Sequence, residues 1–123
     1  MEYFKLAADS YQQLEQPQKA LEILDRGLKL RMHEPLLLMK GQLLYELERY
    51  GEAKGIFQKT VDLNAHNGHA WLMLGYSAFY IEDFKEAQKA FEKALTFSKQ
   101  KNAAREAILQ LTQMNEINSD NTR

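Results

Sequence analysis

The chain has 123 residues, 45% of them hydrophobic, which is the size of one domain with a core of its own. Its 16 basic and 17 acidic residues give a net charge of −1, which excludes the long-range positive field that gathers nucleic acid or anionic lipid. The absence of cysteine excludes disulfides, thiolate nucleophiles and thiolate metal sites, and leaves the redox compartment open.

The beginning of the chain bears on its location. Residues 1–6 carry neither the basic start nor the apolar core of a signal peptide, and no apolar run reaches membrane-spanning length. We therefore expect a soluble, cytoplasmic protein. Two alternatives stay open: the chain starts naturally at Met1, or it is the C-terminal part of a longer protein whose targeting segment lies upstream.

The first expected unit covers residues 1–33 and contains two helices. Apolar residues recur at intervals of three and four, with small Ala8 in the first helix and Ala20 and Leu24 in the second. Pro17 suits the first turn of the second helix, where its missing N–H costs nothing. The pattern predicts an antiparallel helical hairpin.

The second expected unit, residues 34–67, repeats the first after 33 residues. Gly41 corresponds to Ala8, Ala53 to Ala20, and Phe57 to Leu24. Pro35 stands near the expected start of its first helix, as Pro17 does in the preceding unit. A small residue in one helix and a bulky one in the next therefore recur at a fixed offset, which is typical of repeat proteins.

The third expected unit, residues 68–101, repeats the second after 34 residues. Gly75 follows Gly41, Ala87 follows Ala53, and Phe91 follows Phe57. Asp83 and Glu86 have the spacing of an N-terminal capping box before the second helix. The third unit therefore has the same expected hairpin as the first two.

The last expected element is a helix over residues 102–117. Ala104, Ala107, Ile108, Leu111 and Met114 form one apolar stripe among polar residues. Such a helix closes the end of a repeat stack with a polar outer side. We expect residues 118–123, which are polar, to form a frayed tail.

The spacing of Trp71, Leu74, Gly75, Ala87, Phe91 and Ala94 resembles that of a tetratricopeptide repeat. The resemblance covers residues 1–101 and implies an all-α fold: a right-handed superhelical stack of three helix-turn-helix repeats plus a C-terminal capping helix, in one domain. It assigns structural roles to Ala8, Ala20, Gly41, Ala53, Phe57, Trp71, Leu74, Gly75, Ala87, Phe91 and Ala94. The chain departs from the family pattern at Ala65 and Lys99, where the proline that usually ends a unit is missing.

Residues with catalytic or metal-binding chemistry are sparse. His66 and His69 lie three residues apart, but they fall in the expected turn between units and no third ligand accompanies them. There is no glycine-rich phosphate loop, serine elbow or HExxH motif. We therefore expect no enzyme activity, no metal and no cofactor.

The family resemblance also implies where a partner binds, because the first helix of each tetratricopeptide unit lines a concave groove. The corresponding residues here are Lys5, Asp9, Leu38, Gln42, Tyr45, His69, Leu72, Tyr76, Phe79 and Tyr80. We expect Trp71 and Phe84 to pack between helices, whereas Tyr45, Tyr76 and Tyr80 point into the groove as anchors.

Three readings of this aromatic surface remain open. It receives an extended or helical peptide of a partner protein, the C-terminal helix folds partly across it, or two copies pair through it. We favour the first, in which the chain is an adaptor, scaffold or chaperone-like module with a partner of unknown identity and no affinity for nucleic acid or membrane. The rival function is a self-assembly scaffold, including the possibility that the chain is part of a longer repeat protein.

One use of the family fold can be tested by residue type. Some co-chaperones hold the acidic tail of heat-shock chaperones with a clamp of lysines and asparagines. Lys5 stands at one of the clamp positions, but the others carry Asp9, Met39, His69 and Met73. Because an aspartate repels a carboxylate, we expect this chain not to bind acidic tails.

Overall fold

The computed structural model describes the backbone of residues 1–121 and the side chains of residues 1–117. This part of the chain is entirely helical, with α1 (Glu2–Gln13), α2 (Pro17–Leu30), α3 (Glu34–Glu46), α4 (Tyr50–Leu63), α5 (Gly68–Tyr80), α6 (Phe84–Ala94) and α7 (Lys101–Asn121). The expected all-α class is confirmed. Within residues 1–121, none of the helices combines the length and the apolar character that crossing a bilayer requires.

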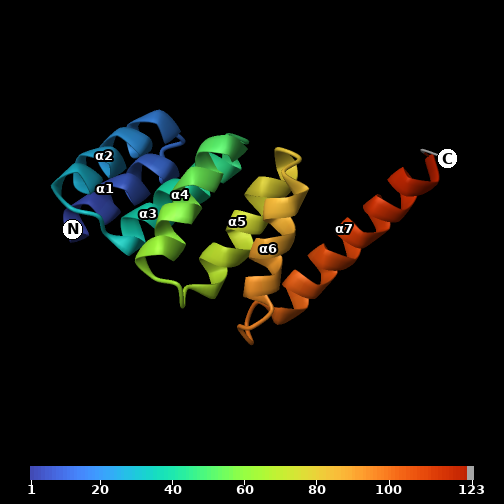
Figure 1. Ribbon diagram of the computed structural model, residues 1–123. Coiled ribbons are helices and arrows are strands. Elements are labelled where there is room, and N and C mark those ends of the chain that lie inside the picture. Colours follow the sequence, from blue (N-terminus) through green and yellow to red (C-terminus); the bar gives the residue numbers. More distant parts are fainter. Residues whose placement is uncertain (122–123) are drawn as a thin grey trace.

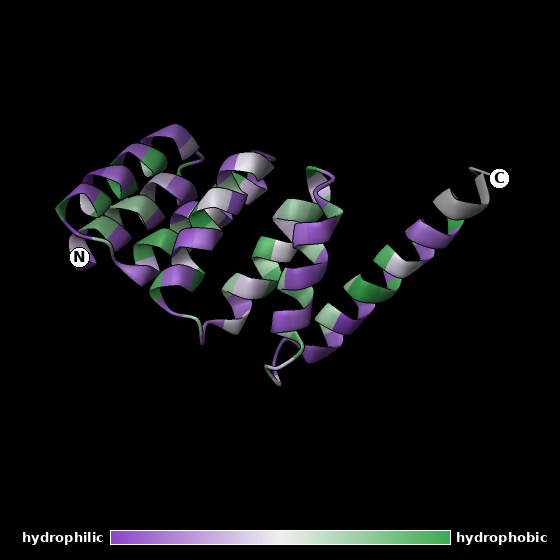
Figure 2. Cartoon of the chain, in the orientation of Figure 1, coloured by the Kyte–Doolittle hydropathy of each residue, from purple (hydrophilic) through white to green (hydrophobic). Residues whose placement is uncertain are grey.

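The helices pack in chain order as a solenoid (Figure 1). The helices of each pair α1/α2, α3/α4 and α5/α6 contact one another, and each pair contacts the next through α2 with α3 and α4 with α5. These pairs fall within the expected units 1–33, 34–67 and 68–101, although the division into three repeats stays a prediction. Figure 2 shows apolar and polar residues interleaved along the helices, as expected where each helix buries one side.

The helix α7 differs from its expected range of 102–117. It begins at Lys101, because the N–H of Ala104 already donates to the Gln100 carbonyl at 2.9 Å. It continues to Asn121, so the tail expected from residue 118 is helical in its backbone up to that point, and residues 122 and 123 lie outside the described part. Figure 1 shows α7 packing beside α6 at its start and extending away from the stack toward the C-terminus.

The turns inside the three pairs share one backbone conformation. Glu15, Glu48 and Glu82 have positive φ angles of 57°, 61° and 63°, in the left-handed region that non-glycine residues rarely adopt. In each turn the next residue donates its N–H to a carbonyl five positions earlier, as from Arg49 to Leu44 at 2.9 Å. This bond satisfies a carbonyl at the end of the helix and reverses the chain tightly.

The start of α6 carries the Asp83 half of the expected capping box, whereas the Asp83 backbone N–H donates to the Ala78 carbonyl at 2.9 Å. The Asp83 carboxylate accepts a hydrogen bond from the Glu86 backbone N–H at 3.3 Å, and its other oxygen lies 3.0 Å from Lys54 Nζ in α4. The hydrogen bond from Lys54, followed by that from Glu86, holds the pKa of Asp83 below its usual range. One side chain therefore caps a helix and links two neighbouring pairs.

The contact between small and bulky residues lies at the centre of the core. A Cβ added to Gly41 would stand 2.8 Å from Cε1 of the Phe57 ring, and one added to Gly75 would stand still closer to Cε1 of Phe91. Both rings are almost completely buried. Ten of the residues assigned structural roles are buried, namely Ala8, Ala20, Gly41, Ala53, Phe57, Leu74, Gly75, Ala87, Phe91 and Ala94; Trp71 is only half-buried.

The Gly75 contact gives a stability prediction with a matched control. Gly75→Ala is expected to lower the free energy of unfolding by about 1–3 kcal/mol, because the new methyl group overlaps the Phe91 ring. Gly55 in α4 has no heavy atom within 4 Å of its added Cβ. Gly55→Ala is therefore expected to raise stability by about 0.5–1 kcal/mol through helix propensity. Urea denaturation followed by circular dichroism measures both, and a Gly75 variant as stable as the Gly55 variant would contradict the packing described.

Candidate partner-binding surface

The ten residues expected to line the groove lie on three helices: Lys5 and Asp9 on α1, Leu38, Gln42 and Tyr45 on α3, and His69, Leu72, Tyr76, Phe79 and Tyr80 on α5. We call the surface they occupy the A-helix face. Three of them, Asp9, His69 and Tyr80, are exposed, and six are half-buried. The remaining one, Leu72, is buried.

Leu72 and Phe79 have structural contacts that the sequence reasoning missed. Leu72 is 9% exposed and belongs to the buried cluster that also contains Ala107 and Leu111 of α7. Phe79 packs against the same cluster, and its ring lies 5.7 Å from that of Phe84. The core beneath the C-terminal helix therefore takes up most of the Leu72 surface, and a contact of Leu72 with a partner stays a prediction.

Tyr76 also packs against the core. Its ring meets the buried Phe91 ring edge to face, with centroids 5.4 Å apart, and only part of its side chain reaches solvent. Tyr76 therefore packs against the core with one part of its side chain, and its expected role as an anchor in the groove stays a prediction. Burial raises the pKa of its hydroxyl, and the nearby Tyr80 hydroxyl adds to the shift.

Three tyrosines from successive helices gather at one end of the A-helix face. The centroids of Tyr45 (α3) and Tyr80 (α5) lie 6.1 Å apart, and Tyr50 (α4) stacks on Tyr80 at 4.6 Å with an interplanar angle of 18°. Tyr45 also meets Tyr50 edge to face at 5.2 Å. We call Tyr45, Tyr50 and Tyr80 the tyrosine cluster. Its outermost member is Tyr80, which is 53% exposed.

Tyr50 was absent from the expected site because it begins the second helix of its pair. The 34-residue period contained the signal, since Tyr50 corresponds to Phe84 and Phe84 packs beside α5. In the structure Tyr50 lies beside α5 as well, but it contacts the exposed ring of Tyr80. A contact between consecutive units thus completes the cluster.

Two hydroxyls of the tyrosine cluster, those of Tyr45 and Tyr50, have raised pKa values. The pKa of Tyr45 is raised to about 12, mainly by burial and in smaller part by the neighbouring hydroxyls of Tyr80 and Tyr50. Burial likewise raises the pKa of Tyr50, with a second contribution from the Glu48 carboxylate. At physiological pH these groups can therefore donate hydrogen bonds to a ligand.

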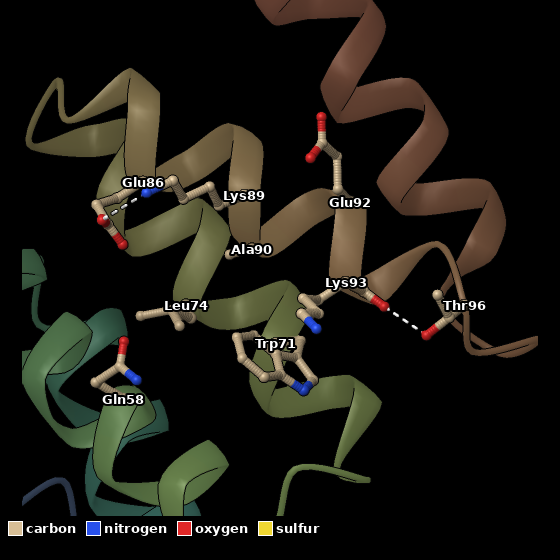
Figure 3. A pocket seen from close by; sticks show the side chains of 9 residues that line it. All are labelled: Gln58, Trp71, Leu74, Glu86, Lys89, Ala90, Glu92, Lys93 and Thr96. Carbon is tan, nitrogen blue, oxygen red and sulfur yellow. Dashed lines mark hydrogen bonds and ion pairs between the residues drawn. The ribbon is translucent and has the colours of Figure 1, made fainter.

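A hollow lies on the other side of α5 from the A-helix face, between α4 and α6 (Figure 3). Its volume is about 620 Å³, and it is lined by Gln58, Trp71, Leu74, Glu86, Lys89, Ala90, Glu92, Lys93 and Thr96. The Trp71 ring lies below Lys93, whose Nζ is 6.0 Å from the ring centroid, and its Nε1–H donates to the Ala65 carbonyl at 2.9 Å. Trp71 is therefore only partly packed between helices, and the rest of its side chain lines this hollow.

The two histidines considered as metal ligands border a smaller hollow of about 340 Å³ at the turn before α5. His66 and His69 are both exposed. Among the residues that the structure describes, no group of three or more histidine or acidic side chains is arranged to hold a metal ion.

Tyr45 gives a pH prediction. Its hydroxyl ionises near pH 12 in the folded chain and near pH 10 in an unperturbed tyrosine. Because the folded state favours the neutral form, this contribution to stability is complete below pH 10 and is lost as the pH rises toward 12. The melting temperature is expected to fall over this window, and less steeply in Tyr45→Phe. Parallel profiles for the two chains would contradict the assignment.

Comparison with known proteins identifies the chain's relatives. A sequence profile of the tetratricopeptide repeat family matches residues 5–53 and 38–103. The human Protein O-mannosyl-transferase TMTC1 is 27% identical over 100 residues, which are 77% of this chain and 11% of that protein. The chain thus spans about a tenth of the length of this curated relative.

Solved structures share the fold. The Arabidopsis OM64 TPR domain superposes with a TM-score of 0.80 at 22% identity, over 92% of this chain and 94% of that one. The first TPR of Spaghetti (RPAP3), solved bound to the HSP90 peptide SRMEEVD, gives 0.77 at 18% identity, over 89% and 91%. MamA from Desulfovibrio magneticus RS-1 gives 0.73 at 19% identity, over 94% and 75%.

Proposed function

The chain belongs to the tetratricopeptide repeat family, and on this premise we propose that it binds a peptide segment of a partner protein on its A-helix face. The fold is one that serves protein interaction and is generally not enzymatic. The observation that carries the proposal is the tyrosine cluster, which presents partly exposed aromatic rings on three rigid helices. Aromatic side chains held in place lose little entropy when a ligand binds, and such residues dominate binding energies.

The polar residues of the A-helix face support a role in orienting the bound segment. Gln42 is half-buried on α3 and His69 is exposed on α5, on the same face as the tyrosines. Both side chains can hydrogen-bond to a peptide backbone. The tyrosine rings would provide apolar contact area, and Gln42 and His69 would fix the orientation of the bound peptide, as polar groups in binding sites commonly do.

The ligand class differs from that of the HSP90 peptide bound by Spaghetti (RPAP3). Among the positions that would clamp an acidic tail, Met73 is 6% exposed and Asp9 places a carboxylate at the surface. Lys5 alone supplies a positive charge there. An acidic C-terminus is therefore a poor ligand for this chain, because the site lacks the paired donors that a carboxylate needs.

Peptide capture can be tested with a displayed random peptide library. Peptides selected on the wild-type chain are expected to bind Tyr80→Ser at least about tenfold more weakly, because the exposed ring of the cluster is lost. Tyr3→Ser is the matched control, since Tyr3 is 62% exposed on α1 but lies outside the A-helix face. Titration of fluorescent peptides measures both affinities. Peptides that bind all three chains equally would show that the A-helix face is not the site.

Self-assembly is the second candidate function, and one observation favours it. Tyr3 on α1 corresponds to Leu36, Ala70 and Ala104 on the later helices, which are each 0% exposed because the preceding pair covers them. Tyr3 itself is 62% exposed, and Leu6, one turn further on, is 60% exposed. This apolar end of α1 can be covered by a second copy.

Light scattering on a sizing column distinguishes the two functions. If the α1 end mediates assembly, the apparent mass of the wild type will rise with concentration, and the variant Tyr3→Glu with Leu6→Glu will stay monomeric. Both side chains are exposed, so the substitutions should not disturb the fold. A wild type that stays monomeric over the whole range would reject the second candidate.

A further inference from the structure

The tyrosine cluster is a prearranged surface. Its rings come from α3, α4 and α5, so their spacing is fixed by the packing of two successive helical pairs. Tyr45 packs against the central core, whereas Tyr80 leaves half of its surface exposed. The rings combine one stacked pair with two edge-to-face pairs, and between them they offer both faces and edges to a ligand.

The cluster also concentrates hydrogen-bond donors. The ring centroids of Tyr50 and Tyr80 lie 5.2 and 6.1 Å from that of Tyr45, which brings three phenol groups together in one place. A ligand with carbonyl acceptors beside apolar surface can use the phenol donors that are not bonded to one another. An α-helix is not such a ligand, since its carbonyls are already paired.

Charge around the cluster is negative. Glu46, Glu48 and Glu82 each stand within two residues of a cluster tyrosine in the sequence, and all three are exposed. Glu48 is near enough to Tyr50 to raise the pKa of its hydroxyl. The neighbouring cation, Arg49, is paired with Glu52, with 2.9 Å between the guanidinium and carboxylate atoms Nη2 and Oε1. The unpaired charge here favours a basic ligand.

We propose that the tyrosine cluster binds a proline-rich segment in the polyproline II conformation, next to arginine or lysine residues of the same partner. This inference rests on the proposed peptide-binding function and names its ligand class. A polyproline II segment has no internal hydrogen bonds, so its carbonyls are free to accept from the phenols while its proline rings pack on the aromatic faces. Residues 1–121 form only helices and turns, which offer no strand edge for a ligand to join as a β-strand.

A set of synthetic peptides tests the ligand class. The probe is a fluorescent oligoproline that ends in two arginines, measured by anisotropy. One comparison peptide replaces the prolines with glycine and serine and keeps the arginines; another keeps the prolines and replaces the arginines with glutamates. The oligoproline probe with two arginines is expected to bind at least about tenfold more tightly than either comparison peptide. If the arginine peptides with and without prolines bind equally, the proposal is overturned, because the charge of the arginines alone would then explain the binding.

Variants of the chain locate the site. Tyr80→Ser is expected to weaken the probe by about tenfold or more, and Tyr80→Phe, which keeps the ring, by only about twofold to fivefold. Glu48→Gln combined with Glu82→Gln is expected to weaken the arginine probe by about threefold and to reduce its sensitivity to salt. Undiminished binding to Tyr80→Ser would place the ligand elsewhere and overturn the proposal.

The outcome also separates this inference from the proposed function. If the oligoproline probe fails while library-selected peptides still lose affinity for Tyr80→Ser, the ligand class is wrong and the A-helix face remains the peptide site. If both kinds of peptide are insensitive to Tyr80→Ser, the proposed function fails as well.

Discussion

A phenylalanine ring packs directly on a glycine in two of the helical pairs, Phe57 on Gly41 and Phe91 on Gly75, and this contact sets how closely the helices approach. A side chain at either glycine would collide with the ring, so the two helices of a pair approach only because that side chain is missing. This close approach sets the spacing between α3 and α4 and between α5 and α6. The spacing in turn fixes where α5 lies relative to α3, and hence where the tyrosine rings meet.

Much of the fold could be predicted because this contact leaves a plain trace in the sequence. A small residue and a bulky residue recur together at a fixed period, and their burial follows from the same geometry. The extent of α7 was less predictable, because the polar residues after 117 are compatible with either a helix or a tail. The left-handed turns at Glu15, Glu48 and Glu82 escaped prediction too, since glutamate rarely adopts that conformation.

The candidate site was predictable only in part. The repeat phase correctly places Tyr45 and Tyr80 on the first helices of their pairs, but it cannot tell a side chain that faces solvent from one that a neighbouring unit covers. Leu72 is covered by the core under α7, and Tyr76 leans on Phe91. Tyr50 joins the cluster from a second helix. Each of these outcomes depends on tertiary contacts between helices, some within a unit and some between units, and the repeat period does not encode which side chains meet in them.

The two sides of the stack differ in a way that matters for function. The A-helix face carries tyrosine rings and hydrogen-bond donors held by the packed helices. The hollow between α4 and α6 is instead lined by lysines and glutamates around Trp71. The central claim is that a partner segment lies on the first of these surfaces. Gln42 on α3 and Gln58 on α4 are both half-buried and represent the two sides, so each can carry a probe in the same way.

Site-specific photocrosslinking shows which of the two surfaces holds the partner segment. A benzophenone amino acid placed at Gln42 in one chain, and at Gln58 in another, is irradiated with a library-selected peptide and the products are mapped by mass spectrometry. Crosslinks are expected from position 42 and none from position 58. Crosslinks from position 58 alone would contradict this expectation and would move the binding site to the opposite side of the stack.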